Sequence, residues 1–367
     1  MKIAFCNRLN WDNPLGGDGV QMLKTKANLE DLYGINIDIV TDPEKLNNSY
    51  DIVHVFNFVT YQVTESFFLK AQSLSIPIVS SCIFWDYTYA QGFTNLFSFT
   101  HISKISASFI KRLVGITAFL FGYPDVFTKQ IRQKYSFFCE KSDLLLPNSK
   151  EEGYLLQEYI RHPDIMDKIH VVYNGTDAEA GNIMEEEAFF NKYDIPRDYI
   201  LQVGRIECVK NQMNVLYALR NDKKIPIVFI GKVAEPSYYK KLKKMANKRG
   251  NVFFIDGVAH EDINSFYYYA RLHVLISLRE SPGLVSLEAL MNKCPIVVSS
   301  ERYTPVKTYF FDQPYVVDPF DIDMIRETLL LAYNERCVVN NNVTTFTWKK
   351  AAEQTFEAYK KVLGIDD

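Results

Sequence analysis

Short apolar runs alternate with helical patterns along the first half of the chain. Six of these runs predict strands, because they are rich in β-branched and aromatic residues and are bounded by turn residues. The runs are Lys2–Cys6, Ile35–Val40, Asp51–Phe56, Ile76–Ser80, Asp143–Pro147 and Ile169–Tyr173. Helical patterns separate them at Val20–Leu32, Thr64–Leu74 and Lys150–Tyr159. Strands that are apolar throughout and lie between helices are typical of a parallel sheet buried on both faces.

The second half repeats this plan. Strands are predicted at Tyr199–Val203, Ile225–Ile230, Val252–Ile255, His273–Ser277 and Pro295–Val298. Helices are predicted at Asn211–Arg220, Ser237–Lys248, Glu261–Ala270, Val285–Met291 and Asp321–Tyr333. The stretch Asn174–Arg197, with its acidic run and a proline, is predicted as the linker. The pattern therefore predicts an α/β protein of two Rossmann-like domains that binds its ligand at the carboxyl ends of the strands.

Composition narrows the class of protein. The length of 367 residues agrees with two domains, and 47% apolar with 23% charged residues is ordinary for a globular protein. A net charge of -3 gives no basic excess for a nucleic-acid partner. The six cysteines show neither a CxxC pair nor zinc spacing, so we expect no metal site and a reducing, cytoplasmic location. The N-terminal sequence lacks the long apolar stretch of a signal peptide.

The longest apolar stretch, Ile102–Tyr123, is interrupted by Lys104, Lys111 and Arg112. It falls short of the ~20 consecutive apolar residues that a membrane-spanning helix needs. A helix in the protein core or cleft would explain it, and so would a helix lying flat on a membrane. The second interpretation predicts a peripheral contact with the inner face of the membrane.

Two glutamates separated by seven residues follow the predicted strand His273–Ser277. Glu280 lies in the loop, and Glu288 lies about one turn into the next helix, where a carboxylate can bind a ribose diol. Gly283 and Leu284 lie between them at the helix start, where free amide groups form an anion site. The alternative is that Glu288 only complements the helix dipole and Glu280 is solvated.

A second loop, which follows the strand Tyr199–Val203, carries Gly204, Arg205 and Lys210. The glycine permits a turn, and a planar guanidinium with an ammonium group suits a diphosphate. The alternative is a pair of solvated surface cations. Their position at the carboxyl end of a strand favours the binding role.

A glycine-rich turn, Asn13–Gly19, follows the first strand and includes Gly16 and Gly17. The backbone amides of such a turn can cradle a phosphate or a sugar. The turn matches neither the dinucleotide fingerprint nor the P-loop, and a tight turn without a ligand is the alternative.

Together these segments resemble the retaining GT-B glycosyltransferases of family 4 (glycosyl transferases group 1), over nearly the whole chain. Segment 203–210 is similar to the family's Gly-Arg…Lys diphosphate clamp, and segment 280–288 to its E-x7-E motif. Asp51–Val55, Asp143–Ser149 and Val171–Asp177 support the resemblance.

The resemblance implies a domain organisation. Residues 1–178 would form a Rossmann-like acceptor-side domain, and 179–345 a Rossmann-like nucleotide-sugar-binding domain that faces it across a cleft. Residues 346–367 would form a C-terminal helix that crosses back to the first domain.

The resemblance also implies roles for matching residues. Arg205 and Lys210 would neutralise the donor diphosphate and Glu280 would hold the donor sugar, which makes these three the catalytic candidates. The donor-binding candidates are Gly16, Gly17, Gly204, Gly257, Val258, Gly283, Leu284 and Glu288, the last on the ribose.

One position departs from the family. Ile83 stands where the family often carries a histidine, so a polar contact to the donor sugar is absent or comes from Trp85 or Asp86. Trp85, Asp86 and Tyr87 are also the acceptor candidates, because aromatic rings stack on sugars. His54 lies inside a buried strand pattern, and we expect it to be structural.

The function implied is a hexosyltransferase that moves a sugar from a UDP- or GDP-linked donor to a carbohydrate or lipid-linked glycan in bacterial surface polysaccharide or glycan synthesis. The resemblance implies no cofactor and no metal ion, since GT-B enzymes usually need none and no DxD-type carboxylate motif stands out in the sequence. Two alternatives stay open. One is a non-catalytic nucleotide-sugar-binding scaffold, and the other is a different GT-B enzyme such as a nucleotide-sugar epimerase.

Overall fold

The computed structural model describes residues 1–12, 16–96, 106–121, 129–177, 182–259, 261–310, 315–335 and 345–365. The chain divides into two compact units. Unit 1 comprises Met1–Trp85, Asp125–Ala178 and Thr345–Asp367, and unit 2 comprises Asp86–Pro124 and Glu179–Thr344.

Unit 1 contains a five-stranded parallel sheet in the order β2-β1-β3-β4-β5. The strands are β1 (Lys2–Cys6), β2 (Asn36–Val40), β3 (Ile52–Phe56), β4 (Ile78–Ser81) and β5 (Leu144–Leu145). Its helices are α1 (Gly17–Tyr33), α2 (Tyr61–Ser73), α5 (Lys129–Lys141), α6 (Lys150–Ile160) and α14 (Trp348–Leu363), with short 3-10 turns at Pro43–Lys45, Phe58–Thr60 and Pro163–Lys168. The prediction of a strand at Ile169–Tyr173 is wrong, because only an isolated bridge joins Ile169 to Leu145.

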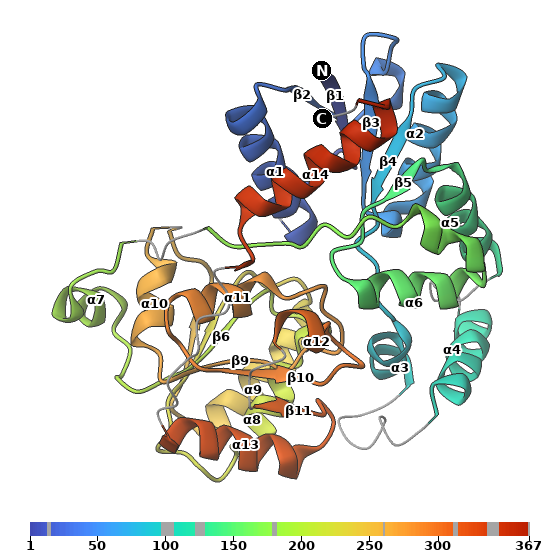
Figure 1. Cartoon of the computed structure of the whole chain (residues 1–367). Coiled ribbons are helices and arrows are strands. Elements are labelled where there is room, and N and C mark those ends of the chain that lie inside the picture. Colours follow the sequence, from blue (N-terminus) through green and yellow to red (C-terminus); the bar gives the residue numbers. More distant parts are fainter. Residues whose placement is uncertain are drawn as a thin grey trace. The chain divides into compact units, whose positions relative to one another are not determined.

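The last helix, α14, packs within unit 1 beside α1 (Figure 1). Its Tyr359 hydroxyl lies 2.6 Å from Nδ1 of His54 on β3, and Nε2 of the same ring lies 2.9 Å from Oγ of Ser81. Burial lowers the pKa of His54 to about 3, so the ring is neutral. His54 is therefore structural, as expected, and it ties the last helix to the central strand.

Unit 2 contains a six-stranded parallel sheet in the order β11-β10-β9-β6-β7-β8. The strands are β6 (Ile200–Val203), β7 (Ile227–Ile230), β8 (Val252–Ile255), β9 (Leu272–Leu275), β10 (Ile296–Ser299) and β11 (Val316–Val317). The helices that the second half of the chain contributes to this unit are α7 (Glu186–Tyr193), α8 (Gln212–Ala218), α9 (Pro236–Arg249), α10 (Ile263–Tyr269), α11 (Leu284–Met291), α12 (Val306–Tyr309) and α13 (Ile322–Glu335). A 3-10 turn, η5, lies at Cys208–Lys210. Two parallel α/β units agree with the predicted fold class.

Two further helices of unit 2, α3 (Thr88–Leu96) and α4 (Ala107–Phe121), come from the first half of the chain. The predicted boundary at 178 places this stretch in the first domain instead. The difference has a physical cause, because the ring of Tyr87 lies 3.8 Å beneath the Arg279 guanidinium and Tyr89 packs edge-on against Tyr303. Such contacts between distant segments leave no trace in the local pattern.

The predicted linker also contains structure. Helix α7 lies inside it, and the carboxylate of Glu185, the residue that caps its N-terminus, accepts the Ala188 N–H at 2.9 Å. The buried ring of Phe189 packs edge-on against Phe266, which fixes the helix to unit 2. The acidic residues that suggested a linker are thus the first turn of a helix, where carboxylates are favourable.

The apolar stretch around Ile102–Tyr123 contains α4, as a helical interpretation requires. Over the described ranges, no helix is both long and apolar enough to cross a bilayer. Within unit 2, α4 packs against α3.

Candidate active site

The strand order of each sheet reverses at one position. In unit 2 it reverses between β6 and β9, and in unit 1 between β1 and β3. Ligands of open parallel sheets bind beyond the carboxyl ends of the strands at this position. The loops that follow these four strands are therefore where a site is expected in each unit.

In unit 2 the two loops at this position are joined directly. The Leu278 N–H, after β9, donates to the Val209 carbonyl, after β6, at 2.8 Å. Lys210 and Glu280 then form an ion pair with 2.5 Å between Nζ and Oε1. Their side chains are only 18% and 11% exposed, so the pair is shielded from water. The two motifs found in the sequence thus meet at one point.

Backbone contacts hold both members of this pair. The Lys210 carbonyl accepts from Nε2 of the buried Gln202 at 2.7 Å, and the Glu280 N–H donates to the Tyr303 carbonyl at 2.8 Å. A charged pair in a partly desolvated position interacts more strongly than it would in water. An anionic ligand can bind the ammonium group, while hydroxyl groups can donate to the carboxylate.

Gly204 shapes the first loop. It adopts φ 146°, and a Cβ there would contact the Lys210 side chain. The sequence analysis missed its counterpart, Gly231, which follows β7 with φ 145°. A Cβ on Gly231 would lie 2.2 Å from the Gly204 carbonyl oxygen, so only glycine lets the two backbones approach this closely. The sequence could have revealed Gly231, because a glycine directly follows each of the neighbouring strands β6 and β7.

Arg205 lies in the same loop, and its side chain is 47% exposed. Its Nη2 lies 3.0 Å from Oε1 of Glu207. Its guanidinium would have to leave Glu207 to bind a diphosphate. The loop geometry itself is held, because Nε2 of Gln212 donates to the Arg205 carbonyl at 2.9 Å.

The second glutamate of the motif, Glu288, lies on α11 and accepts a hydrogen bond from the Tyr267 hydroxyl at 2.9 Å. Burial, with a smaller contribution from Glu288, raises the pKa of Tyr267, so this hydroxyl stays protonated and donates. The sequence analysis did not identify Tyr267. Gly283 precedes the helix with φ 92° and leads into Leu284.

Gly257 and Val258 follow β8, at the edge of the sheet and two strands away from β6. Among the described residues, no atom outside its chain neighbours lies within 4 Å of the position that a Gly257 Cβ would take. Gly257 is exposed and Val258 is half-buried.

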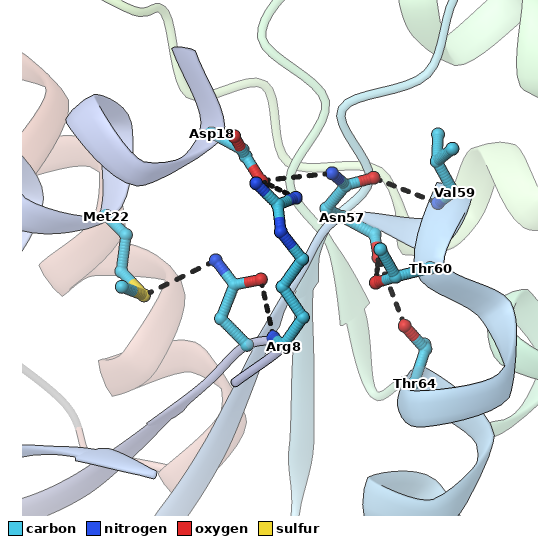
Figure 2. A network of polar contacts seen from close by, with 8 residues as sticks. Arg8, Asp18, Met22, Asn57, Val59, Thr60 and Thr64 are labelled. Atoms are coloured by element: carbon cyan, nitrogen blue, oxygen red, sulfur yellow. Dashed lines mark hydrogen bonds and ion pairs between the residues drawn. The ribbon is translucent and has the colours of Figure 1, made fainter. Parts of the chain in front are cut away.

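Unit 1 carries a polar network at its own reversal point (Figure 2). Nη1 of Arg8, just after β1, lies 2.7 Å from Oδ2 of Asp18 in the first turn of α1. The same oxygen accepts from Nδ2 of Asn57, just after β3, at 3.2 Å. Asn57 adopts φ 73° and accepts the Val59 N–H at 2.9 Å. A nearly buried carboxylate, a cation and an amide therefore meet beyond β1 and β3.

Sequence reasoning missed this network, although Arg8 and Asn57 lie directly after predicted strands. The glycine-rich turn that it did identify lies beside the network. A Cβ on Gly16 would lie 2.7 Å from Oδ1 of Asp18, whereas a Cβ on Gly17 would have no neighbour within 4 Å among the described residues. Residues 13–15 of that turn lie outside the described residues.

The three acceptor candidates do not form an open stacking surface. Trp85 is buried, and the Asp86 carboxylate accepts the Thr88 N–H at 2.8 Å at the start of α3. The Tyr87 ring is covered by Arg279. Ile83 adopts φ 49°, a left-handed conformation that costs an L-residue about 1–2 kcal/mol.

No group of three or more histidine, cysteine or carboxylate side chains within the described ranges could hold a metal ion. The five cysteines in those ranges are buried and form no disulfide with one another. Burial raises the pKa of four of them: Cys6, Cys82, Cys139 and Cys294.

The fold and these sites define the class of protein: two parallel-sheet Rossmann-like units of the GT-B type. Residues 184–361 match the family "Glycosyl transferases group 1". The structure is similar to sucrose-phosphate synthase from Thermosynechococcus elongatus, with a TM-score of 0.73, 13% identity and full coverage of both chains. It is also similar to Anabaena Alr3699/HepE in complex with UDP and glucose, with a TM-score of 0.62, 13% identity and coverage of 100% of this chain and 97% of that one.

Two curated relatives agree with this class. The serotype-specific mannosyltransferase WbdA of Escherichia coli is 22% identical over 47% of this chain and 23% of its own length. The D-inositol 3-phosphate glycosyltransferase of Corynebacterium efficiens is 25% identical over 60% of this chain and 57% of its own length. The chain thus spans less than two thirds of these relatives. The structural similarity confirms the predicted GT-B fold, and the family match covers the part of the chain that carries the Lys210 and Glu280 loops.

Proposed function

We propose that the protein transfers a sugar from a nucleotide-sugar donor, UDP- or GDP-linked, to a carbohydrate acceptor with retention of the anomeric configuration and without a metal ion. The observation that carries the proposal is the joining of Lys210 and Glu280 at the β6/β9 reversal point, with Glu288 on the following helix. These are the charges that a donor needs: a cation for the diphosphate, a carboxylate for the sugar and a second carboxylate for the ribose.

The reaction follows from these charges. The bond between the anomeric carbon and the diphosphate oxygen breaks while the acceptor oxygen forms a bond to the same carbon. The acceptor proton passes to a phosphate oxygen on the same face of the sugar. Lys210 and Arg205 stabilise the charge that develops on the departing diphosphate, and the amides at Gly283 and Leu284 orient the donor.

We propose that the acceptor binds to unit 1 at the Arg8–Asp18–Asn57 network. An ionised carboxylate accepts hydrogen bonds from sugar hydroxyls, and Asp18 is held in place by two donors. We no longer assign acceptor binding to Trp85 and Tyr87, because the ring of Trp85 is buried and the ring of Tyr87 is covered by Arg279.

The relatives support a nucleotide-sugar donor and a glycan product. One is a serotype-specific mannosyltransferase, and one structural neighbour was solved with UDP and glucose. A role in bacterial surface polysaccharide synthesis, at the cytoplasmic side, agrees with the first of these names.

Helix α4 supports a lipid-linked acceptor. Phe109, Ile116 and Leu120 are 51%, 47% and 64% exposed, and their spacing of seven and four residues places them on one face of the helix. Ile110 and Val114, about a third of a turn away from this face, are buried. The helix contains Lys111 and Arg112 and no acidic residue, so its charge suits an anionic membrane surface.

The proposal is tested by following donor and product together. Incubation with nucleotide sugars and a glycan acceptor should release nucleoside diphosphate and give a product with the donor's anomeric configuration, read by NMR. Lys210→Met should lower kcat by about 10²–10³-fold, as the loss of one charge-stabilising donor does.

The same assay separates the alternatives. An epimerised nucleotide sugar would indicate an epimerase, and donor binding without any turnover would indicate a scaffold. An inverted product would contradict the retaining mechanism. Unchanged activity in the presence of EDTA is expected.

A further inference from the structure

Helix α3 lies against the residues that flank Glu280. The Tyr87 ring lies directly under the Arg279 guanidinium, with 3.8 Å between the ring centroid and the guanidinium carbon. Arg279 immediately precedes Glu280. A guanidinium stacked at this distance is held by both the ring quadrupole and van der Waals contact.

A second contact of α3 involves Tyr303, the hydrogen-bond partner of the Glu280 backbone. Tyr89 packs edge-on against Tyr303, with 5.4 Å between the ring centroids and 68° between their planes. Both rings are buried. The Tyr303 carbonyl is the acceptor of the Glu280 N–H at 2.8 Å, so the position of Tyr303 sets the position of the Glu280 backbone.

The same helix also contacts η5, the short turn that ends at Lys210. Helix α3 therefore lies against both loops that supply the Lys210–Glu280 pair. Its own start is fixed, because the Asp86 carboxylate accepts hydrogen bonds from both the N–H and the hydroxyl of Thr88.

We propose that Tyr87 and Tyr89 are positioning residues that hold Glu280 and Lys210 in register for the donor sugar. This inference rests on the proposed function for its catalytic part. Loops that present catalytic charges need support from a second layer of packed side chains, since a displacement of about 1 Å can cost a hundredfold in rate. Here the support comes from a helix of the other half of the sequence.

The Tyr87 ring, and not its hydroxyl group, carries this role. Among the described residues, the buried Tyr87 hydroxyl has no hydrogen-bond partner. A phenylalanine at this position should therefore keep the positioning role, whereas an alanine should lose it.

The experiment compares Tyr87→Phe, Tyr87→Ala and a matched control, Tyr217→Ala. Tyr217 on α8 stacks under Arg220 with 4.5 Å to the guanidinium carbon, so the control removes the same kind of contact elsewhere in unit 2. The first measurement is amide hydrogen exchange of the peptide that contains Glu280, without any ligand. The second is kcat with a nucleotide sugar, together with the Kd of the free nucleoside diphosphate.

In Tyr87→Ala we expect exchange at the Glu280 peptide to be about 3- to 30-fold faster, from the size of a partly desolvated cation–π contact. We expect kcat to fall by a similar factor while the Kd of the nucleoside diphosphate stays within twofold. Tyr87→Phe and Tyr217→Ala should leave all three quantities within twofold.

The proposal is overturned if Tyr87→Ala exchanges like the wild type, or if the phenylalanine variant is as impaired as the alanine variant. Failure of the proposed function is a separate result. If the wild type turns over no nucleotide sugar, the transferase assignment fails, while hydrogen exchange still decides whether α3 holds Glu280.

Discussion

Two buried histidines make the stability of both units depend on pH. His54 in unit 1 and His273 in unit 2 are each buried, and burial lowers the pKa of each to about 3. In the unfolded chain a histidine has a pKa near 6.5. Between pH 6.5 and 3 the unfolded chain therefore binds protons that the folded chain does not, and stability falls as the pH falls.

The expected loss is about 1.4 kcal/mol per pH unit for each histidine, or about 2 kcal/mol between pH 6.5 and 5. His54→Asn should remove this part of the pH dependence from unit 1 and leave that of unit 2. Urea unfolding at the two pH values, followed by hydrogen exchange in each unit, measures it. Equal pH dependence in unit 1 of the variant and the wild type would show that His54 is not the source.

Arg249 is a second residue whose role is only visible in three dimensions. Its guanidinium is buried and donates to five backbone carbonyls, those of Leu219, Asp222, Ile225, Gly250 and Asn251. It thereby joins the end of α9 to the loop before β7. Lysine has three donors and no planar fork, so it cannot replace these bonds.

We expect Arg249→Lys to lower the free energy of unfolding of unit 2 by about 2–3 kcal/mol, because buried carbonyls lose their donors. Arg220→Lys, at an exposed position of the same unit, is the control and should change it by less than about 0.5 kcal/mol. Chemical unfolding monitored by exchange of unit 2 peptides distinguishes the two. An Arg249→Lys variant as stable as the control would contradict the role assigned to these bonds.

At the scale of elements, the sequence predicted most strands because they are short, apolar and bounded by turns. The bounds of β1 and β8 agree with the prediction residue for residue. The prediction failed where distant contacts decide, as at α7, whose Phe189 packs on Phe266 far along the chain.

The two candidate sites differ in the same way in how far the sequence predicts them. The loops with Lys210 and Glu280 could be found because each carries a motif at the end of a strand. The Arg8–Asp18–Asn57 network could not, since it consists of single polar residues that only the strand order β2-β1-β3 brings together. The strand order itself depends on long-range packing, which a single sequence does not reveal.

The exposed face of α4 leads to a prediction about membranes. Replacing Leu120 by serine should reduce binding to vesicles with anionic lipid by about tenfold, because the side chain would leave apolar surroundings. Leu331→Ser on α13 is the matched control, since Leu331 is also an exposed leucine of unit 2. Vesicle sedimentation with phosphatidylglycerol measures binding.

Two outcomes would contradict this docking role. Wild-type protein that stays in the supernatant at every anionic lipid content would exclude it. Equal losses in the two leucine variants would show that the face of α4 is not the contact.

At the scale of the whole molecule, each unit carries polar residues where its strand order reverses. Unit 2 carries the Lys210–Glu280 ion pair, which we propose binds the nucleotide sugar, and unit 1 carries the Asp18 carboxylate, which we propose binds acceptor hydroxyl groups. The proposed transfer requires a donor site and an acceptor site, and each unit supplies one of them.

The most direct test of the account is a thermal-shift titration of the full chain with UDP-, GDP-, ADP- and dTDP-sugars, with and without EDTA. A ligand at 100 times its Kd adds about 2.7 kcal/mol to stability, which corresponds to several degrees for a unit of this size. We predict such a shift with one nucleotide class, unaffected by EDTA and lost in Arg205→Ala and Glu288→Ala. The absence of a shift with all four, or a shift that survives in both variants, would contradict the placement of the donor at the β6/β9 reversal point.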